Sequence, residues 1–453
     1  MNLLPLLAAF VPWARTPLSA FTSIYLSCAL LSIEMQLVTV TKTGSLRALV
    51  PLNLLLALGS TVWHYSRARR PWAWIAPVRE WAPIPALPLM AALVLFLNLW
   101  LPFEAADPYQ LERVAQIERT GTLSYDGAAD PKVNIATGFY ELMVADLRQL
   151  PLGPIIVRLH GVIGVAVYSL ALAAIAPWFS VRSLWARTLL FLVPVVFHQF
   201  VLLKNDLFLA LPSLVALAWL VSGSAEKPVH HAAWAGWLAG MVVGSKTANA
   251  PVAATLAIGV LLLHKPRLQA TAALAAGGLV GAICGGLALT LFQNAIFYGD
   301  MFAIHPMSEM GGLNTTPFES LVGIGRFLIS LVDLELVTTR LWPGRGGWGS
   351  TLGLPAIWAL AVLISHAGRF SEAWKALLAS GACMVAFAIA FHDADLAQRI
   401  VLGPGLLLVV VAASIADRSP ARWVRTSLSL AVVLSAAQIV RSVLLYLARQ
   451  PVT

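Results

Sequence analysis

The chain has 453 residues, of which 59% are hydrophobic and only 11% are charged. Soluble domains average about 25% charged residues, so this composition excludes an ordinary water-soluble protein. The net charge of +9 does not indicate a nucleic-acid partner, because no basic run is interleaved with aromatic residues. We therefore expect an all-α polytopic membrane protein, with every backbone group satisfied inside helices embedded in a lipid bilayer.

Apolar stretches long enough to cross a bilayer recur along the whole chain, since a span needs roughly 17–25 mostly apolar residues. We predict about thirteen transmembrane helices in a single domain over residues 1–453. The candidate spans lie at residues 18–40, 47–66, 83–102, 153–176, 187–203, 206–222, 231–246, 249–264, 269–297, 352–367, 373–391, 399–416 and 425–447.

The bias of Lys and Arg toward cytoplasmic loops orients these spans. If the amino end lies inside, every inner connection carries a basic residue and most acidic residues fall in outer loops. The inner basic residues are Arg67, Arg69, Arg70, Arg79, Arg182, Arg187, Lys227, Lys265, Arg267, Arg369, Lys375, Arg418, Arg422 and Arg425. The odd number of spans then places the carboxyl end outside.

Two predicted outer loops are long, at residues 103–150 and 298–350. In the first, apolar residues from Tyr140 to Leu147 recur at i, i+3, i+4 and i+7, which predicts an amphipathic helix that could lie on the membrane surface. In the second, residues 318–338 are apolar but contain charged residues, each of which costs about 2.5–3.5 kcal/mol at a helix centre. We interpret this segment as an interfacial or re-entrant helix rather than a further span.

The first outer loop opens with two carboxylates, Glu104 and Asp107, directly after the third predicted span. A carboxylate at this depth suits a general base that acts on a lipid-borne substrate. The same residues also fit a helix start, because Asp107 precedes Pro108 and Gln110 follows three residues later, as in a capping box. The two roles are compatible, since a cap also fixes the direction of the carboxylate.

Three cations stand at the predicted outer face, against the orienting rule. Lys204 and Asp206 form either a mutual ion pair or an interfacial anchor, and Lys246 either binds an anionic ligand or extends to the membrane surface. Arg399 ends a tight outer loop and begins a span, so its guanidinium could bind a phosphate unless the loop is an ordinary connector.

Other polar residues within the apolar stretches give weaker signals. Glu34 is isolated in the first span, and the sequence does not identify its partner. Cys28, Cys284 and Cys383 lie in apolar stretches, with neither metal-ligand spacing nor an evident pairing. The chain has no P-loop, HExxH or paired-cysteine motif, so we assign no metal ligands. A divalent cofactor is possible but not required by the sequence.

Together these segments resemble the integral-membrane glycosyltransferases of the GT-C superfamily, including its protein mannosyltransferase and aminoarabinose transferase-like families. Residues 103–114 resemble the acidic motif that opens the first outer loop of that superfamily, and residues 203–207 and 240–247 resemble two further motifs. Residues 398–404 look like its Arg-led motif before a late span. The similarity runs in order through most of residues 83–416, although two spans precede the loop-bearing one where the family usually has one.

This resemblance implies transfer of a sugar from a polyprenyl-phosphate carrier to a glycan, lipid or protein acceptor. It also implies a bacterial inner membrane location with the active site facing the periplasm. Asp107 would be the base, with Glu104 as its neighbour or alternate. Lys204, Lys246 and Arg399 would hold the donor phosphate, and Asp206 would orient Lys204.

Two other functions fit the same composition. A transporter or flippase of a lipid-linked or small solute would favour inverted repeats and polar sites at the midplane, and the sequence shows neither. An oligosaccharide polymerase or ligase would share the membrane and the donor, but would transfer a block instead of a single sugar.

Overall fold

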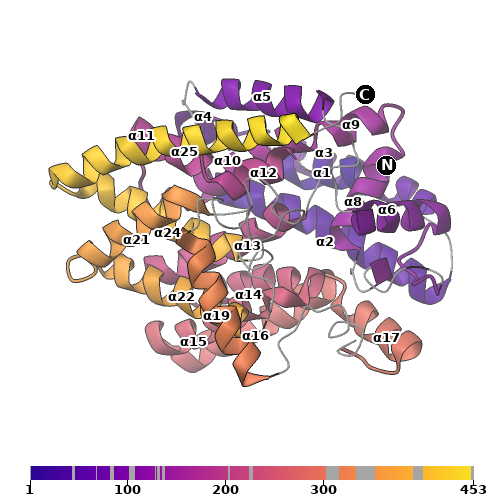
Figure 1. The fold of residues 1–453 in the computed structure, drawn as a ribbon. Helices are drawn as coiled ribbons and strands as arrows, with labels where there is room; N and C mark the ends of the chain where they lie inside the picture. The colour runs from indigo at the N-terminus through magenta and orange to yellow at the C-terminus, as the bar shows by residue number, and fades with distance from the viewer. Residues whose placement is uncertain are drawn as a thin grey trace.

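The computed structural model describes residues 2–42, 46–67, 69–81, 86–100, 108–127, 129, 133–134, 138–201, 205–223, 228–302, 316–332, 352–390 and 401–449. Within these ranges the regular elements are all helices (Figure 1). The α-helices are α1 (Leu3–Phe10), α2 (Pro17–Thr41), α3 (Val50–Ser66), α4 (Ile75–Trp81), α5 (Ala86–Trp100), α6 (Pro108–Thr120), α8 (Phe139–Arg148), α9 (Gly153–Arg158), α10 (His160–Ile175), α11 (Leu184–Phe191), α12 (Pro194–Val201), α13 (Asp206–Ser222), α14 (Pro228–Ser245), α15 (Ala250–Leu263), α16 (Arg267–Cys284), α17 (Leu287–Tyr298), α19 (Pro317–Val332), α21 (Gly353–His366), α22 (Ser371–Ala390), α24 (Leu402–Arg418) and α25 (Arg422–Arg449). Three short 3₁₀ helices are η1 (Val11–Trp13), η2 (Leu46–Leu49) and η4 (Thr247–Asn249). The all-α prediction is confirmed for the described chain.

Several of these helices could span a membrane. By length and composition, five helices of the described chain qualify: Pro17–Thr41, Arg47–Ser66, Arg267–Cys284, Ser371–Ala390 and Arg422–Arg441. A sixth is obtained if α11 and α12, which are bent by 54° relative to each other, count as one span. The prediction of about thirteen spans is therefore not confirmed within the described residues.

The difference has a local cause in the backbone. Most of the other predicted spans correspond to apolar helices of only 10–17 residues. The predicted span 187–203 is broken before Pro194, which lacks an N–H for the helical ladder. The predicted span 269–297 is broken at Gly286, whose φ of 97° is outside the helical region.

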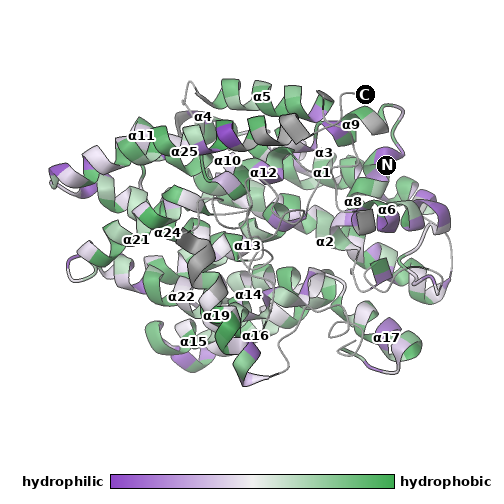
Figure 2. Cartoon of the chain, viewed as in Figure 1, coloured by the Kyte–Doolittle hydropathy of each residue, from purple (hydrophilic) through white to green (hydrophobic). Residues whose placement is uncertain are grey.

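Apolar residues lie along the helices at the edge of the bundle as well as along those at its centre (Figure 2). On α3, for example, Leu52, Leu55, Leu58 and Val62 are all more than half exposed. At the centre of the molecule, nearly every residue of α13 and of α24 is buried. A helix bundle with a dry core and an exposed apolar rim is what a lipid environment permits.

The amino-terminal helix α1 packs against α2 and α3 and corrects one part of the predicted topology. Its first residues are held by Asp146 of α8, which accepts hydrogen bonds from the Asn2 and Leu3 backbone N–H groups at 2.8 and 2.9 Å. We expected the amino end and residues 103–150 on opposite sides of the membrane, and this contact excludes that arrangement. Helix α1 continues through η1 into α2, the predicted first span.

Helices α14 and α16 pack closely against each other. Glycines on both helices face the backbone of the partner: a Cβ added at Gly240 would clash with the Gly278 carbonyl, and one at Gly281 with the Trp237 carbonyl. Gly244 meets Ala282 in the same way. Small residues let two membrane helices approach until their backbones touch, and the resulting van der Waals contact replaces the hydrophobic driving force that lipid does not supply.

The predicted first outer loop contains two helices, α6 and α8, which pack on each other. The predicted helix around residues 140–147 is confirmed as α8. It is not a free surface helix, because seven of its residues are buried, including Glu141 and Asp146. In the second outer loop, the described part of residues 318–338 forms α19, which packs against α22. The interfacial position expected for α19 stays a prediction.

Candidate functional site

An ion pair joins the start of α13 to the end of α14. Asp206 is the first residue of α13, and Lys246 directly follows the last residue of α14. The Lys246 Nζ donates to the Asp206 Oδ1 at 2.6 Å. The Asp206 side chain is 6% exposed and that of Lys246 is 26% exposed, so the carboxylate is sequestered while the ammonium is still reached by solvent.

Glu141 of α8 adds a second carboxyl group to this place. Its side chain is buried, and the Asn205 Nδ2 donates to its Oε1 at 3.4 Å. Burial raises the pKa of Glu141. This rise in the pKa is only partly offset by the hydrogen bond from its own backbone N–H, the charges of Arg113 and Lys246, and the hydrogen bond from Asn205. Because Asn205 precedes Asp206 in the chain, Glu141 and the Lys246–Asp206 pair belong to one polar cluster.

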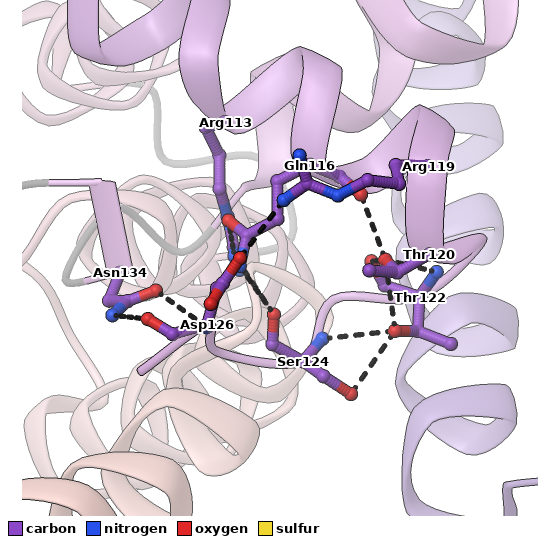
Figure 3. Close-up of polar contacts among 8 residues, drawn as sticks. All are labelled: Arg113, Gln116, Arg119, Thr120, Thr122, Ser124, Asp126 and Asn134. Carbon is purple, nitrogen blue, oxygen red and sulfur yellow. Dashed lines mark hydrogen bonds and ion pairs between the residues drawn. The ribbon is translucent and has the colours of Figure 1, made fainter. Parts of the chain in front are cut away.

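Arg113 of α6 brings a second cation to the cluster and is itself almost fully buried. Its guanidinium donates to the Gln116 Oε1 at 2.7 Å and to the Ser124 carbonyl at 3.2 Å (Figure 3). It also donates to the Leu123 carbonyl at 2.9 Å. Burial lowers the pKa of Arg113 from its ordinary value, and the charge of Glu141 acts against this shift. Arg113 therefore ties α6 to the chain that follows it, and its positive charge partly opposes the rise in the pKa of the buried Glu141 carboxyl group.

The turn after α6 extends this polar structure to a distant helix. The Asp126 backbone pairs with the Asn134 side chain through two hydrogen bonds, also drawn in Figure 3. The Tyr125 hydroxyl donates to the Asn294 Oδ1 of α17 at 2.7 Å. The turn at Tyr125 is thus fixed against α17, more than 150 residues later in the chain.

The structure brings two of the six predicted site residues together. Asp206 and Lys246 form the ion pair described above, whereas we had assigned Asp206 to Lys204. The other four, Glu104, Asp107, Lys204 and Arg399, lie outside the described residues. The described part of helix α6 runs from Pro108, and the helix start at Asp107 stays a prediction.

Sequence reasoning assigned no role to Glu141 or Arg113. The sequence does mark both residues, because each is a charged residue in an amphipathic segment of the first outer loop. Pairing them requires knowledge of how α6 crosses α8, which no spacing in the sequence provides. The partner of Glu34 was likewise unreadable, and it is Asn53 of α3, whose Nδ2 donates to the Glu34 Oε2 at 3.0 Å.

The remaining candidate chemistry is sparse in the described part of the chain. Cys28, Cys284 and Cys383 are buried and free, as their apolar surroundings predicted. Among the residues that the structure describes, no three His, Cys, Asp or Glu side chains are grouped closely enough to hold a metal ion.

Comparison with known proteins does not add to this picture. No family model, no curated protein and no solved structure matches the chain. The class that the structure defines is therefore an all-helical protein with several helices able to span a membrane, and a buried charged cluster where four helices meet.

Proposed function

We propose that this chain is a membrane glycosyltransferase of the GT-C kind, which transfers a sugar from a polyprenyl-phosphate carrier to an acceptor hydroxyl. The single observation that carries the proposal is the Lys246–Asp206 ion pair, set beside buried Glu141 and Arg113 of the first outer loop. In the bacterial inner membrane this cluster would face the periplasm, and the acceptor would be a glycan, a lipid or a protein.

Lys246 suits the donor phosphate because of how it is held. An ammonium group has three N–H donors, and its bond to Asp206 occupies one of them. Its partial exposure leaves it accessible to a phosphate oxygen, whereas Asp206 is sequestered. Asp206 thus fixes the direction of the Lys246 side chain, and this preorganised charge can stabilise a leaving phosphate.

In the reaction that we propose, the acceptor oxygen attacks the anomeric carbon of the sugar and the bond from that carbon to the phosphate oxygen breaks. The hydroxyl proton passes to a carboxylate, for which we propose Asp107 with Glu104 as neighbour or alternate. Polyprenyl phosphate leaves with the bonding electron pair, and Lys246, Lys204 and Arg399 offset its charge. A positioned base contributes roughly 10²–10⁴-fold, and displacement from the opposite face inverts the anomeric centre.

The test compares Asp107→Asn and Lys246→Met with the unaltered chain in membranes supplied with radiolabelled polyprenyl-phosphate sugars. Both variants should lose transfer by about 10²-fold or more, given what a base or an electrostatic donor contributes. Lys375→Met on α22 is the matched control, since it removes the same charge elsewhere and should retain transfer. Full transfer by Asp107→Asn at normal insertion would remove Asp107 from the mechanism. Absence of transfer by the unaltered chain with every donor would overturn the proposal.

A further inference from the structure

A group of buried polar atoms around Glu141 has no hydrogen-bond partner. Among the described residues these atoms are the Gln110 Oε1, the Arg113 Nε and the Asn205 Oδ1. Gln110 and Arg113 are 2% and 1% exposed, so bulk water does not compensate them. A buried polar atom left unpaired costs about 1–3 kcal/mol, so such atoms usually have a partner.

These atoms lie in one neighbourhood. The Asn205 side chain donates to Glu141, so its unpaired oxygen is beside that carboxyl group. The Arg113 Nε lies against Gly138, the residue that precedes α8, because a Cβ built on Gly138 would be 3.3 Å from it. Gln110 is three residues before Arg113 on α6 and therefore on the same face of that helix, which packs along α8.

From this arrangement we propose that Gln110, Asn205 and Glu141 form a subsite for hydroxyl groups of the transferred sugar, adjoining the phosphate position at Lys246. The proposal rests on the function proposed above and adds the part of the substrate that these residues recognise.

The chemistry of the unpaired atoms selects a hydroxyl-bearing ligand. Two of the three are amide oxygens, which can only accept hydrogen bonds. A fully ionised phosphate has acceptors but no donor, so it cannot satisfy them. A sugar ring carries several hydroxyls that donate, and these same hydroxyls can accept a bond from the Arg113 Nε.

The position of the subsite matches the order of groups in the donor. In a polyprenyl-phosphate sugar the sugar follows directly on the phosphate. In the chain, Asn205 precedes Asp206, whose carboxylate holds the Lys246 ammonium at 2.6 Å. Asn205 and Lys246 are partly exposed, whereas Glu141 and Gln110 are buried, so a ligand would approach the cluster from Asn205 and Lys246.

The experiment measures binding of two kinds of lipid to the full chain by native mass spectrometry in detergent. One is undecaprenyl phosphate without a sugar, and the others are undecaprenyl-phosphate glucose, mannose, galactose and aminoarabinose. The unaltered chain should bind at least one sugar-bearing lipid about tenfold more tightly than the sugar-free lipid, which is 1.4 kcal/mol. Gln110→Leu and Glu141→Gln should abolish this preference without changing affinity for the sugar-free lipid. Lys246→Met should weaken binding of the sugar-free and the sugar-bearing lipids by the same factor.

Gln438→Leu is the matched control for Gln110→Leu, because Gln438 is also a buried glutamine whose amide atoms are unpaired, on α25. Both leucine variants should melt at the same temperature as the unaltered chain or higher, since each removes an unpaired buried group. Only Gln110→Leu should lose the sugar preference.

The outcomes separate the two proposals. If the unaltered chain binds both kinds of lipid with equal affinity, or if Gln110→Leu and Glu141→Gln keep the preference, the subsite is wrong and the proposed function stands. If the unaltered chain binds neither kind of lipid, the proposed function fails and the subsite fails with it.

Discussion

Lys246 and Asp206 are 40 residues apart in the chain, yet their side chains meet at 2.6 Å. The contact arises because α13 begins at Asp206 and α14 ends at Ser245, so two consecutive packed helices return the chain to the same end of the bundle. What matters is that the two helices have nearly equal lengths, 17 and 18 residues.

We predict that the two partners of this ion pair are energetically coupled. Asp206→Asn and Lys246→Met should each lower the melting temperature in detergent, because each removes the ion pair from a mostly buried place. The double variant should be less destabilised than the sum of the singles, with an interaction energy of about 0.5–3 kcal/mol. Thermal unfolding, monitored by tryptophan fluorescence, gives the change in stability of each single variant and of the double variant. Strict additivity would show that the pair contributes nothing to stability.

A second prediction concerns pH and Glu141. Because burial raises the pKa of Glu141 above its ordinary value of 4.5, the folded state holds this proton more tightly than the unfolded state does. The contribution of Glu141 to stability is therefore fully present below pH 4.5 and is lost as the pH rises through the folded-state pKa. Glu141→Gln, which cannot ionise, should lack this loss.

The measurement is the melting temperature of both proteins in steps from pH 4 to pH 8. Stability of the variant relative to the unaltered chain should increase with pH across this window. Glu118→Gln on α6 is a useful comparison, since burial also raises the pKa of Glu118 while the Arg148 charge opposes it. A constant difference at all pH values would mean that Glu141 titrates alike in the folded and unfolded states.

Much of the fold was predictable from apolar segments, because a lipid-exposed helix must be apolar along its whole length. The helix that runs from Pro108 and the helix around Tyr140 followed from a proline signal and an i, i+3, i+4 spacing. The number of full spans was not predictable in the same way. A hydropathy pattern continues smoothly through Gly286, whereas the backbone there leaves the helical region and divides one expected span into α16 and α17.

The site was predictable only in its residue types. Unusual charges at the predicted outer ends of helices singled out Asp206 and Lys246, and those two do meet. Their pairing depends on which helices are neighbours, which is tertiary information. Asp146 illustrates the same limit: in the sequence it is one more acidic loop residue, and in the structure it binds the backbone at the start of α1. No local pattern links residues 144 positions apart.

A third prediction tests the close approach of α14 and α16. Gly240→Ala should destabilise the protein by about 1–3 kcal/mol, because the new methyl group would overlap the Gly278 carbonyl of α16 and backbone cannot move aside as a side chain can. Gly381→Ala on α22 is the matched control, since nothing lies within 4 Å of its added Cβ. In that half-buried helical position, with open space around the added Cβ, alanine should be neutral or stabilising by up to about 1 kcal/mol. Equal melting temperatures for the two variants would contradict the packing of α14 on α16.

The last prediction concerns the sides of the membrane. The distribution of basic residues places Arg67, at the end of α3, inside, and places Arg119, near the end of α6, outside. Single variants Arg67→Cys and Arg119→Cys introduce a reactive thiol at exposed positions, while the native cysteines are buried and should react slowly. A membrane-impermeant maleimide added to intact cells should label Arg119→Cys strongly and leave Arg67→Cys unlabelled until the cells are broken.

The reverse pattern would invert the topology and place the Lys246–Asp206 cluster on the cytoplasmic face, where an acceptor outside the cell could not reach it. Labelling of both variants in intact cells would mean that α5, between them in the chain, does not cross the bilayer, and would require a different path from α3 to α6.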